Sequence, residues 1–537
     1  MSTEQAEIQR LKQIVKALQQ ADCFSHAVQH FEVIETHISI LLLTGDYAYK
    51  FKKPVDLGFV DFTSLDKRQH YCTEEIRLNR RLAPELYLDV VAVGGSVDAP
   101  VLNETPAIEY CVQMRQFPRS AELENALAED RVDAQAFRQL ATSVAAFHDR
   151  ADAVSAADAY GRFDQVRQQC LDNFDVLNEP LPDLDLTAEL KPLESWTRAQ
   201  LEQQRDTIEA RREAGRVREC HGDMHVTNMI WLDGSIQVFD CIEFNPELRW
   251  IDVQSEIAFL LMDLDMRGHH ASARVFLNAY LEAGGDYAGL RLLPLFQVYR
   301  SLVRAKIAYL RLRDGAGDTA LAQRIHDHVQ LAQRYGGQDS NAPARPPLVI
   351  THGLSGSGKT TISDALIPLA GALRVRSDVE RKRLQGLAAD AHTDSGIGQG
   401  VYDPASTART YARLADCARA IIASGRAAIV DATFLQRDQR QQFQALAAEL
   451  NVPFRILDCQ APAAVLRQRV QARAEQDSDA SEADLAVLEQ QLSNRQPFSD
   501  SETTHVVALD TCARLDSKAL GERLGLTDGA GTRGGGH

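Results

Sequence analysis

The second half of the chain contains a complete phosphate-binding motif, G-x-x-x-x-G-K-[ST]. The motif and the residue after it comprise Gly353, Leu354, Ser355, Gly356, Ser357, Gly358, Lys359, Thr360 and Thr361. Glycines let backbone N–H groups converge on phosphate oxygens, and a helix N-terminus adds its partial positive charge. We expect Lys359 to reach the β- and γ-phosphates of a nucleotide and the Thr360 hydroxyl to bind Mg²⁺.

A chance glycine-rich turn is the alternative interpretation of this motif. The apolar run 348–350 directly before it is typical of a strand, and the run 361–366 directly after it is typical of a helix. Because a phosphate-binding loop joins a strand to a helix, this context favours a phosphate-binding loop over a chance turn. It predicts that the chain binds ATP with Mg²⁺.

Two aspartates follow later apolar runs. Asp378 comes after the run 373–376, and Asp431 ends the run 427–430. Residues at the carboxyl ends of parallel strands face the ligand crevice. Asp378 is therefore a candidate base for an acceptor hydroxyl, with Arg381 one turn later, and Asp431 would order Mg²⁺ or its waters. The alternatives are that Asp378 caps the next helix and that Asp431 merely ends a strand.

A second group of polar residues lies in the first half. Asp223 and Asn228 have the spacing D-x-x-x-x-N, and Asp240 ends the apolar run 236–239. Two carboxylates and an amide are sufficient to hold metal ions and an acceptor hydroxyl at one Mg-ATP. The spacing therefore predicts a second ATP site of a different design.

The same segment has two other interpretations. His221 and His225 have the i, i+4 spacing that binds zinc on a helix. Gly222 and the apolar run after the segment disfavour a helix there, so we do not expect zinc. A loop with a purely structural role is the remaining alternative.

Residues 346 to about 510 resemble the small P-loop kinases, which include polynucleotide kinases, zeta-toxin-type kinases and gluconate-kinase-like proteins. The resemblance rests on the order strand, P-loop, helix, S-D-x-x-R, V-D-A-T-F and an arginine-rich helix. It implies that Arg469 or Arg473 closes over the phosphates and stabilises charge in the transition state. The alternative for each arginine is a solvated basic helix face. The acidic run 477–484 that follows is expected to form a lid loop.

The segments H-G-D-M-H-V-T-N-M-I-W and V-F-D-C-I-E-F closely resemble the aminoglycoside phosphotransferase superfamily. By position, the resemblance implies that Asp223 is the catalytic base and that Asn228 and Asp240 are metal ligands. It also implies that Lys50 is the phosphate-binding lysine and that Glu75, on the following helix, pairs with it.

The lysine and its partner each have neighbours that fit the pattern. Lys52 or Lys53 could take the place of Lys50, and Glu74 could take the place of Glu75. A third alternative is that these lysines lie at an exposed strand edge.

The first half departs from the pattern of protein kinases at two points. The segment 35–39 stands where a G-x-G-x-x-G loop would precede Lys50. Asp240 is followed by Cys-Ile-Glu and not by Phe-Gly, and the Glu243 of that sequence would either support the metal site or face solvent.

The two resemblances together cover nearly the whole chain. Their combination resembles bacterial fused proteins described as bifunctional aminoglycoside phosphotransferase-like/ATP-binding proteins. It implies an α/β and α+β two-domain fold, with a bilobal protein-kinase-like fold first and a P-loop NTPase parallel sheet with helices on both faces second. The expected limits are 1–335 for the kinase domain, 336–347 for a linker, 348–528 for the P-loop domain and 529–537 for a disordered tail.

These limits rest on the elements that must position the motifs. The segment 336–347 is polar, ends in three prolines and follows the long helical stretch 293–335. The runs 38–43 and 47–51 predict paired strands, and 121–215 is mostly helical in pattern. After the linker, short β-rich runs alternate with helices, which predicts stacked βαβ units.

Composition fits a chain of two or three compact domains. The 537 residues are 45% hydrophobic and 25% charged, which excludes a disordered or collagen-like chain. The net charge of −17 opposes binding to polyanions. The nine cysteines form no C-x-x-C pair, which is typical of reduced thiols. No apolar stretch has the length of a membrane span, and residues 1–20 lack the apolar core of a signal peptide, so we expect a cytoplasmic protein.

These patterns predict a bifunctional ATP-dependent kinase with two independent Mg-ATP sites. Each half would transfer the γ-phosphoryl group of ATP to a hydroxyl of a small molecule or nucleotide. A nucleic-acid end is disfavoured by the net charge, and a protein target stays open for the first half. One alternative is that only one half is active. The other is a sensor or switch that binds and hydrolyses ATP without a separate acceptor.

Overall fold

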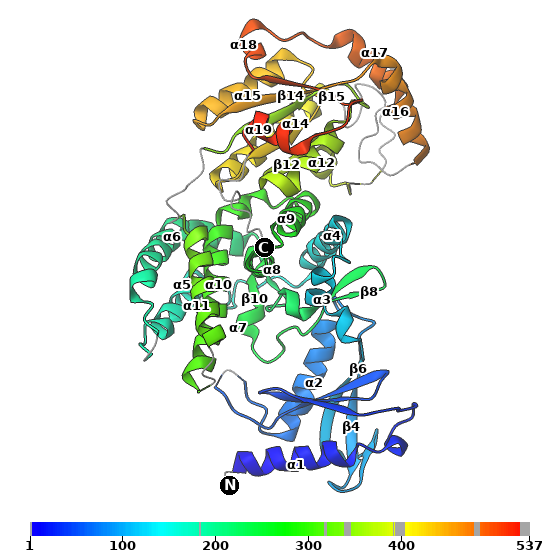
Figure 1. Ribbon diagram of the computed structural model, residues 1–537, viewed down its shortest axis with the longest axis vertical. Helices are drawn as coiled ribbons and strands as arrows, with labels where there is room; N and C mark the ends of the chain where they lie inside the picture. The colour runs from blue at the N-terminus through cyan, green and yellow to red at the C-terminus, as the bar shows by residue number, and fades with distance from the viewer. Residues whose placement is uncertain are drawn as a thin grey trace. The chain divides into compact units, whose positions relative to one another are not determined.

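The computed structural model (Figure 1) describes residues 3–58, 60–181, 184–315, 319–337, 345–389, 391, 403–476 and 484–526. The chain forms two compact units. The first consists of Met1–Leu140, Phe147–Gln168 and Arg205–Asp263. The second consists of Ala141–Ala146, Gln169–Gln204 and Leu264–His537.

The first unit contains a six-stranded sheet in the order β1-β2-β3-β6-β4-β5, all of whose pairs are antiparallel. The strands are β1 (Glu32–Glu35), β2 (Ser39–Leu43), β3 (Tyr47–Lys52), β4 (Tyr87–Gly95), β5 (Pro100–Leu102) and β6 (Glu109–Arg115). The predicted pairing of the runs 38–43 and 47–51 is confirmed, because β2 and β3 pair with Leu41 opposite Lys50.

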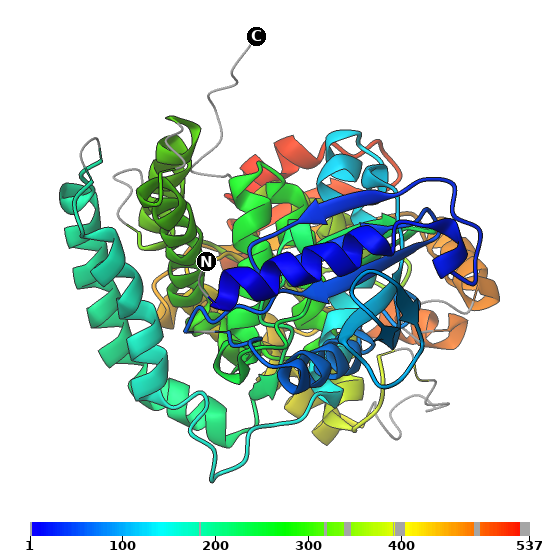
Figure 2. The same cartoon turned by 90° about the horizontal axis from the view of Figure 1, so that it is seen from below.

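Helices cover both faces of this sheet. Helix α1 (Thr3–Ala17) buries Leu11, Ile14 and other apolar side chains against one face, and Figure 2 shows it lying over the sheet. Helix α2 (Leu65–Asn79) packs Cys72 and Ile76 against the other face. Apolar residues at spacings of three and four place one stripe of each helix on the sheet.

Helices predominate in the next part of the chain, as the sequence predicts. They are α3 (Leu123–Ala128), α4 (Ala134–Arg150), α5 (Phe163–Leu177) and α6 (Thr187–Glu213). Short elements then surround the D-x-x-x-x-N segment: β7 (Val217–Glu219), β8 (Met229–Leu232), β9 (Ser235–Val238), α7 (Pro246–Arg249) and β10 (Trp250–Asp252). The apolar helix α8 (Val253–Met266) follows, and β8 and β9 form a hairpin.

The second unit contains a five-stranded parallel sheet in the order β12-β13-β11-β14-β15. Its strands are β11 (Leu348–His352), β12 (Leu373–Arg376), β13 (Ala428–Asp431), β14 (Phe454–Gln460) and β15 (Val506–Asp510). Its helices are α12 (Lys359–Ala370), α13 (Ser377–Leu384), α14 (Pro404–Ala423), α15 (Arg437–Glu449), α16 (Ala463–Gln476), α17 (Leu485–Asn494), α18 (Asp500–Thr503) and α19 (Ser517–Leu524). The predicted α/β sheet is confirmed. Strands β11, β12, β13 and β14 are largely buried on both faces, as is typical of parallel strands, whereas the edge strand β15 is partly exposed.

Before this sheet, the second unit contains α9 (His270–Gly284), a 3₁₀ turn η4 (Tyr287–Arg291), α10 (Leu293–Arg313) and α11 (Thr319–Tyr335). The predicted helical stretch 293–335 thus contains two helices, which pack against each other.

Several predicted segments lie outside the described residues. They are most of the linker (338–344), most of the lid loop (477–483) and the tail 529–537. The predicted domain limits therefore stay predictions. Among the described residues, no helix combines the length and the apolar character needed to cross a membrane.

Candidate active sites

Lys50 on β3 contacts two acidic residues from distant parts of the chain. Its Nζ donates to Oε1 of Glu75 on α2 at 2.8 Å and to Oδ1 of Asp240, after β9, at 2.6 Å. Burial opposes the charge on Lys50, but Asp240 and Glu75 outweigh it and raise the lysine pKa well above its ordinary value. The structure thus brings together three residues that the sequence assigned to one site.

Lys52 points to the same face of β3, because side chains two residues apart share a face. Its Nζ is buried and donates to Oε2 of Glu75 at 2.6 Å and to Glu243. Glu75 is fully buried, and although burial would raise its pKa, Lys50 and Lys52 lower it to about 2. The alternative in which Glu243 faces solvent is wrong, since Glu243 is buried against Lys52.

These contacts distinguish Lys50 and Glu75 from the neighbouring residues that could take their places. The charge of Lys52 is enclosed between two carboxylates, whereas Lys50 faces the half-exposed Asp240. Lys53, directly after β3, pairs with Glu35 at 2.6 Å. Glu74 pairs with Arg77 at 2.8 Å. The geometry therefore favours Lys50 and Glu75 as the pair nearest to a bound phosphate.

The segment 221–228 forms a loop. Nδ2 of Asn228 donates to Oδ2 of Asp223 at 2.8 Å, and Nε2 of His225 lies 3.3 Å from the same oxygen. The backbone N–H of Phe239 donates to the carbonyl oxygen of Asn228 at 3.0 Å, which ties the residue before Asp240 to the loop. Asp223, Asn228 and Asp240 are thus held next to each other. The expectation that no helix forms between His221 and His225 is confirmed.

Helix α8 supports this loop with two buried carboxylates. Glu256 accepts hydrogen bonds from the backbone N–H groups of His221 at 3.2 Å and Gly222 at 3.0 Å. Asp263 accepts one from the N–H of Val226 at 2.9 Å. Sequence reasoning missed both residues; the signal was that they flank the apolar run 257–262 within the helix 253–266.

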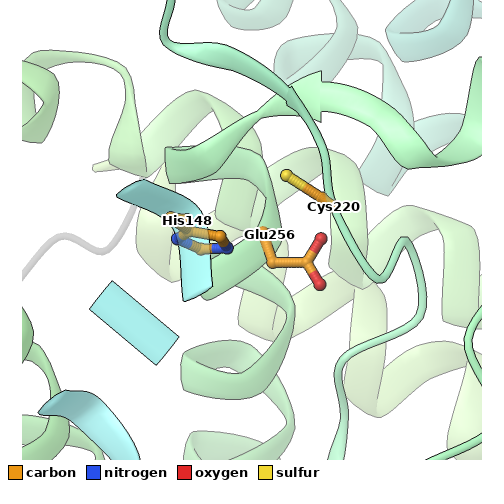
Figure 3. A group of neighbouring side chains, drawn as sticks. All are labelled: His148, Cys220 and Glu256. Atoms are coloured by element: carbon orange, nitrogen blue, oxygen red, sulfur yellow. The ribbon is translucent and has the colours of Figure 1, made fainter. Parts of the chain in front are cut away.

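Glu256 also belongs to a buried group with His148 and Cys220, whose ligand-type atoms lie within 4.8 Å of one another (Figure 3). Such a group could in principle hold a metal ion. However, the Glu256 carboxylate already accepts hydrogen bonds from the loop, and Sγ of Cys220 donates to the carbonyl oxygen of Ile251 at 3.5 Å. We therefore interpret the group as support for the loop.

His221 links the loop to β9 through both ring nitrogens. Nε2 donates to the carbonyl oxygen of Phe239 at 2.9 Å, and Nδ1 accepts from the N–H of Asp223 at 3.3 Å. This arrangement needs the neutral ring. Burial lowers the pKa of His221 to about 4 and outweighs the opposite effect of Asp223.

We expect the free energy of unfolding to fall as the pH is lowered from about 6.5 to about 4. Between these values the unfolded chain binds a proton at residue 221 that the folded chain excludes, so stability rises with pH by up to about 1.4 kcal/mol per pH unit. Urea unfolding at several pH values measures this slope. His221→Gln should reduce it, and an equal slope in both proteins would contradict the assignment.

The phosphate-binding motif forms the turn between β11 and α12. Gly353, Gly356 and Gly358 have φ of 148°, 79° and 84°, which side chains rarely adopt. A Cβ at Gly353 would lie 2.5 Å from Oγ of Ser357. Nζ of Lys359 donates to the carbonyl oxygens of Gly353 and Leu354, both at 2.9 Å. The loop thus folds closely around the lysine, as a cradle for phosphate oxygens requires.

Two polar groups of the motif fit a phosphate and a metal ion. The buried Oγ of Ser357 has no hydrogen-bond partner within the described residues. Thr360 lies in the first turn of α12 beside the exposed Thr361. Asp431, at the end of β13, accepts hydrogen bonds from Thr351 at 3.4 Å and from Ser363 at 3.3 Å. It is buried next to the strand that leads into the motif.

Asp378 lies half-buried in the first turn of α13. The residue at the N-cap of this helix is Arg376, so the alternative in which Asp378 caps the helix is wrong. Arg381, one turn later, is buried and donates to Oγ1 of Thr407 on α14 at 3.3 Å. Both follow the carboxyl end of β12.

Of the two arginines expected on the lid helix, Arg469 reaches the phosphate-binding loop. Its Nη1 lies 3.4 Å from the carbonyl oxygen of Gly356 and donates to Oγ1 of Thr511 at 3.0 Å. Arg473 lies one turn later on α16, and its side chain is outside the described part of the chain.

Comparison with known proteins finds a family match in each half of the chain. Residues 71–293 match the model of the phosphotransferase enzyme family, APH. Residues 348–498 match the model of an AAA domain, AAA_33. An uncharacterized protein of Mycobacterium tuberculosis is 28% identical over 477 residues, which is 87% of this chain and 91% of the relative.

Two solved structures illustrate the similarity of each part. A choline/ethanolamine kinase family protein from Mesorhizobium loti is 12% identical and covers 61% of this chain and 98% of its own, with a TM-score of 0.39. A gluconokinase from Sinorhizobium meliloti 1021 is 20% identical and covers 34% of this chain and 93% of its own, with a TM-score of 0.24. The two family matches support a kinase-type phosphotransferase, in which a segment similar to APH, residues 71–293, is followed by a segment similar to AAA_33, residues 348–498.

Proposed function

We propose that this protein is a bifunctional ATP-dependent phosphotransferase of the cytoplasm, with two separate Mg-ATP sites. The observation that supports the proposal is that each half brings candidate side chains together: Lys50 with Glu75 and Asp240 in the first half, and Lys359 with the phosphate-binding loop in the second. The acceptors that fit both sites are hydroxyl groups of small molecules or nucleotides.

In the first half, Lys50 binds the phosphates and Glu75 orients it. Asp223 accepts the proton of the acceptor hydroxyl, and it is oriented by the amide of Asn228. Asn228 and Asp240 offer the oxygen ligands that Mg²⁺ prefers. Mg²⁺, when bound, neutralises charge on the phosphate groups.

In the second half, the backbone of the phosphate-binding loop and Lys359 hold the phosphates. Thr360 and Asp431 form the metal side of this site, and Asp378 takes the acceptor proton. A base and Arg381 beyond the carboxyl end of β12 favour a phosphotransferase over a pure ATPase switch, which needs no acceptor base. The net charge of −17 argues against a nucleic-acid end as the usual acceptor.

The test is transfer of labelled γ-phosphate from Mg-ATP into a metabolite extract, read by mass spectrometry. Wild type is compared with Asp223→Ala and Asp378→Ala. A phosphorylated species that is lost in one variant only assigns its acceptor to that half. If the wild type binds and hydrolyses ATP but labels no acceptor, the proposal is wrong and the chain acts as a switch. Protein acceptors are tested by adding a protein extract to the same assay.

A further inference from the structure

Within the second unit, side chains of the α9–η4 segment cover the edge of strand β12. The backbone N–H of Arg374 donates to Oδ1 of Asn278 at 2.7 Å, and the Tyr287 hydroxyl donates to the carbonyl oxygen of Arg374 at 3.3 Å. In the described sheet, β12 has a neighbouring strand on one side only. Open strand edges need to be covered, and here two side chains take the place of a further strand.

The side chain of Arg374 extends this contact to the phosphate-binding loop. Its side chain is 6% exposed, and its Nη2 lies 3.1 Å from Oε2 of Glu282 on α9 and 3.3 Å from Oδ1 of Asp364 on α12. Nη1 donates to the backbone oxygen of Thr360 at 3.1 Å and lies 3.4 Å from Oγ of Ser363. Ser363 donates in turn to Asp431. A continuous series of contacts therefore joins Glu282 to the two residues that we assign to Mg²⁺.

The other carboxylate oxygen of Glu282 contacts the start of α13. Its Oε1 accepts a hydrogen bond from Nη1 of Arg376 at 3.1 Å. Arg376 is the N-cap residue of the helix that carries Asp378. Burial would raise the pKa of Glu282, but the two arginines lower it, so the carboxylate is charged at neutral pH.

The C-terminal end of α9 also contacts α13 through Arg383. Its guanidinium donates to the backbone oxygens of Glu282 and, at 3.0 Å, of Ala283. Cations are favourable at the C-terminus of a helix, where carbonyl groups lack partners. Gly285 has a φ of 70°, and a Cβ there would lie 2.6 Å from Nε of Arg383. The approach of α13 to the end of α9 therefore depends on a glycine at this position.

We propose that Glu282 is a positioning residue for the phosphate-binding site of the second half. It holds Arg374 against Thr360 and Arg376 at the start of α13, and so fixes the place of a Mg²⁺ ligand and of the acceptor base. The inference rests on the proposed function of the second half. Because Glu282 lies in the part that matches the APH family, 71–293, the P-loop site is completed by residues from outside the P-loop segment.

The test measures how much Mg²⁺ tightens the binding of a non-hydrolysable ATP analogue to the full chain, by calorimetry. Lys359→Met identifies the part of the binding that belongs to the phosphate-binding loop. Glu282→Gln keeps the shape of the side chain and removes its charge. We expect Glu282→Gln to reduce about tenfold the factor by which Mg²⁺ increases the affinity of this site for the analogue. A loss of this size is typical when an outer partner of a metal ligand is removed. The affinity without Mg²⁺ should be unchanged.

Glu282→Asp is the second variant, which keeps the charge on a shorter side chain and is expected to lose a smaller part of the tightening. Glu449→Gln removes an exposed partner of Arg419 in the same unit and should behave as wild type. Thermal melting checks that each variant is folded. If Glu282→Gln does not fold, the result for Glu282→Asp decides the test. Unchanged tightening in a folded Glu282 variant overturns the inference and leaves the proposed function standing. If wild type and Lys359→Met bind the analogue equally well, the inference and the proposed function of the second half are both overturned.

Discussion

Replacing Asp223 by asparagine is expected to lower phosphoryl transfer by the first half about 10²- to 10⁴-fold, which is the usual contribution of a general base. The carboxylate accepts a hydrogen bond from Asn228 at 2.8 Å and is one-third exposed, so it is held in place and open to an acceptor. Asparagine keeps the size but cannot take the proton. The measurement is the initial rate with the acceptor identified for this half, with ATP binding measured in parallel.

Binding of ATP by the first half should change little, because Lys50, Glu75 and Asp240 are untouched in this variant. The matched control is Asp233→Asn. Asp233 is an exposed turn residue with φ of 50°, a conformation that asparagine adopts easily. A fall in rate that is equal in the two variants would contradict the role of Asp223, and so would full activity of Asp223→Asn.

The phosphate-binding loop could be predicted from sequence because all its determinants are local. The strand β11, the glycines with positive φ and the helix α12 follow one another within 348–370. The same holds for the loop 221–228, where Gly222 and the following hairpin disfavour an α-helix and only the 3₁₀ turn Val226–Asn228 forms. In such segments, residue type and spacing are enough to predict the backbone and to name the candidate chemistry.

The choice between Lys50 and Lys52 could not be made from sequence, because both side chains lie on one face of β3 and both bind Glu75. What distinguishes them is the second carboxylate that each contacts, Asp240 or Glu243. These contacts join residues about 190 positions apart, and no local pattern encodes them. The role of Glu256 was missed for the same reason, since its partners lie 34 and 35 positions before it.

The domain division expected from the linker also needs the three-dimensional contacts. Proline and polar residues predict where one domain ends, but they do not indicate which elements pack together. Helix α9 precedes the linker and packs in the second unit against α12 and β12. Asn278 and Glu282, which make this contact, look like ordinary polar residues on the surface of a helix.

The second large effect is expected for Lys359→Met, which should lower phosphoryl transfer or ATP hydrolysis by the second half about 10²- to 10³-fold, the usual effect of removing one stabilising charge or donor from a transition state. Nζ of Lys359 is held between the carbonyl oxygens of Gly353 and Leu354, so its position is fixed by the loop. Methionine fills a similar space but carries no charge. The measurement is the turnover of Mg-ATP by the second half, in a chain whose first half is inactivated by Asp223→Asn.

Lys518→Met is the control, since it removes an exposed lysine from α19 of the same unit and should leave turnover unchanged. Transfer by the first half, measured in a chain with Asp223 intact, is also expected to be unaffected by Lys359→Met, because the first site has its own lysine in Lys50. If Lys359→Met abolished both activities while the protein stayed folded, the two sites would not be independent. Turnover that persists in the double variant Asp223→Asn/Lys359→Met would show that neither residue serves the reaction assigned to it.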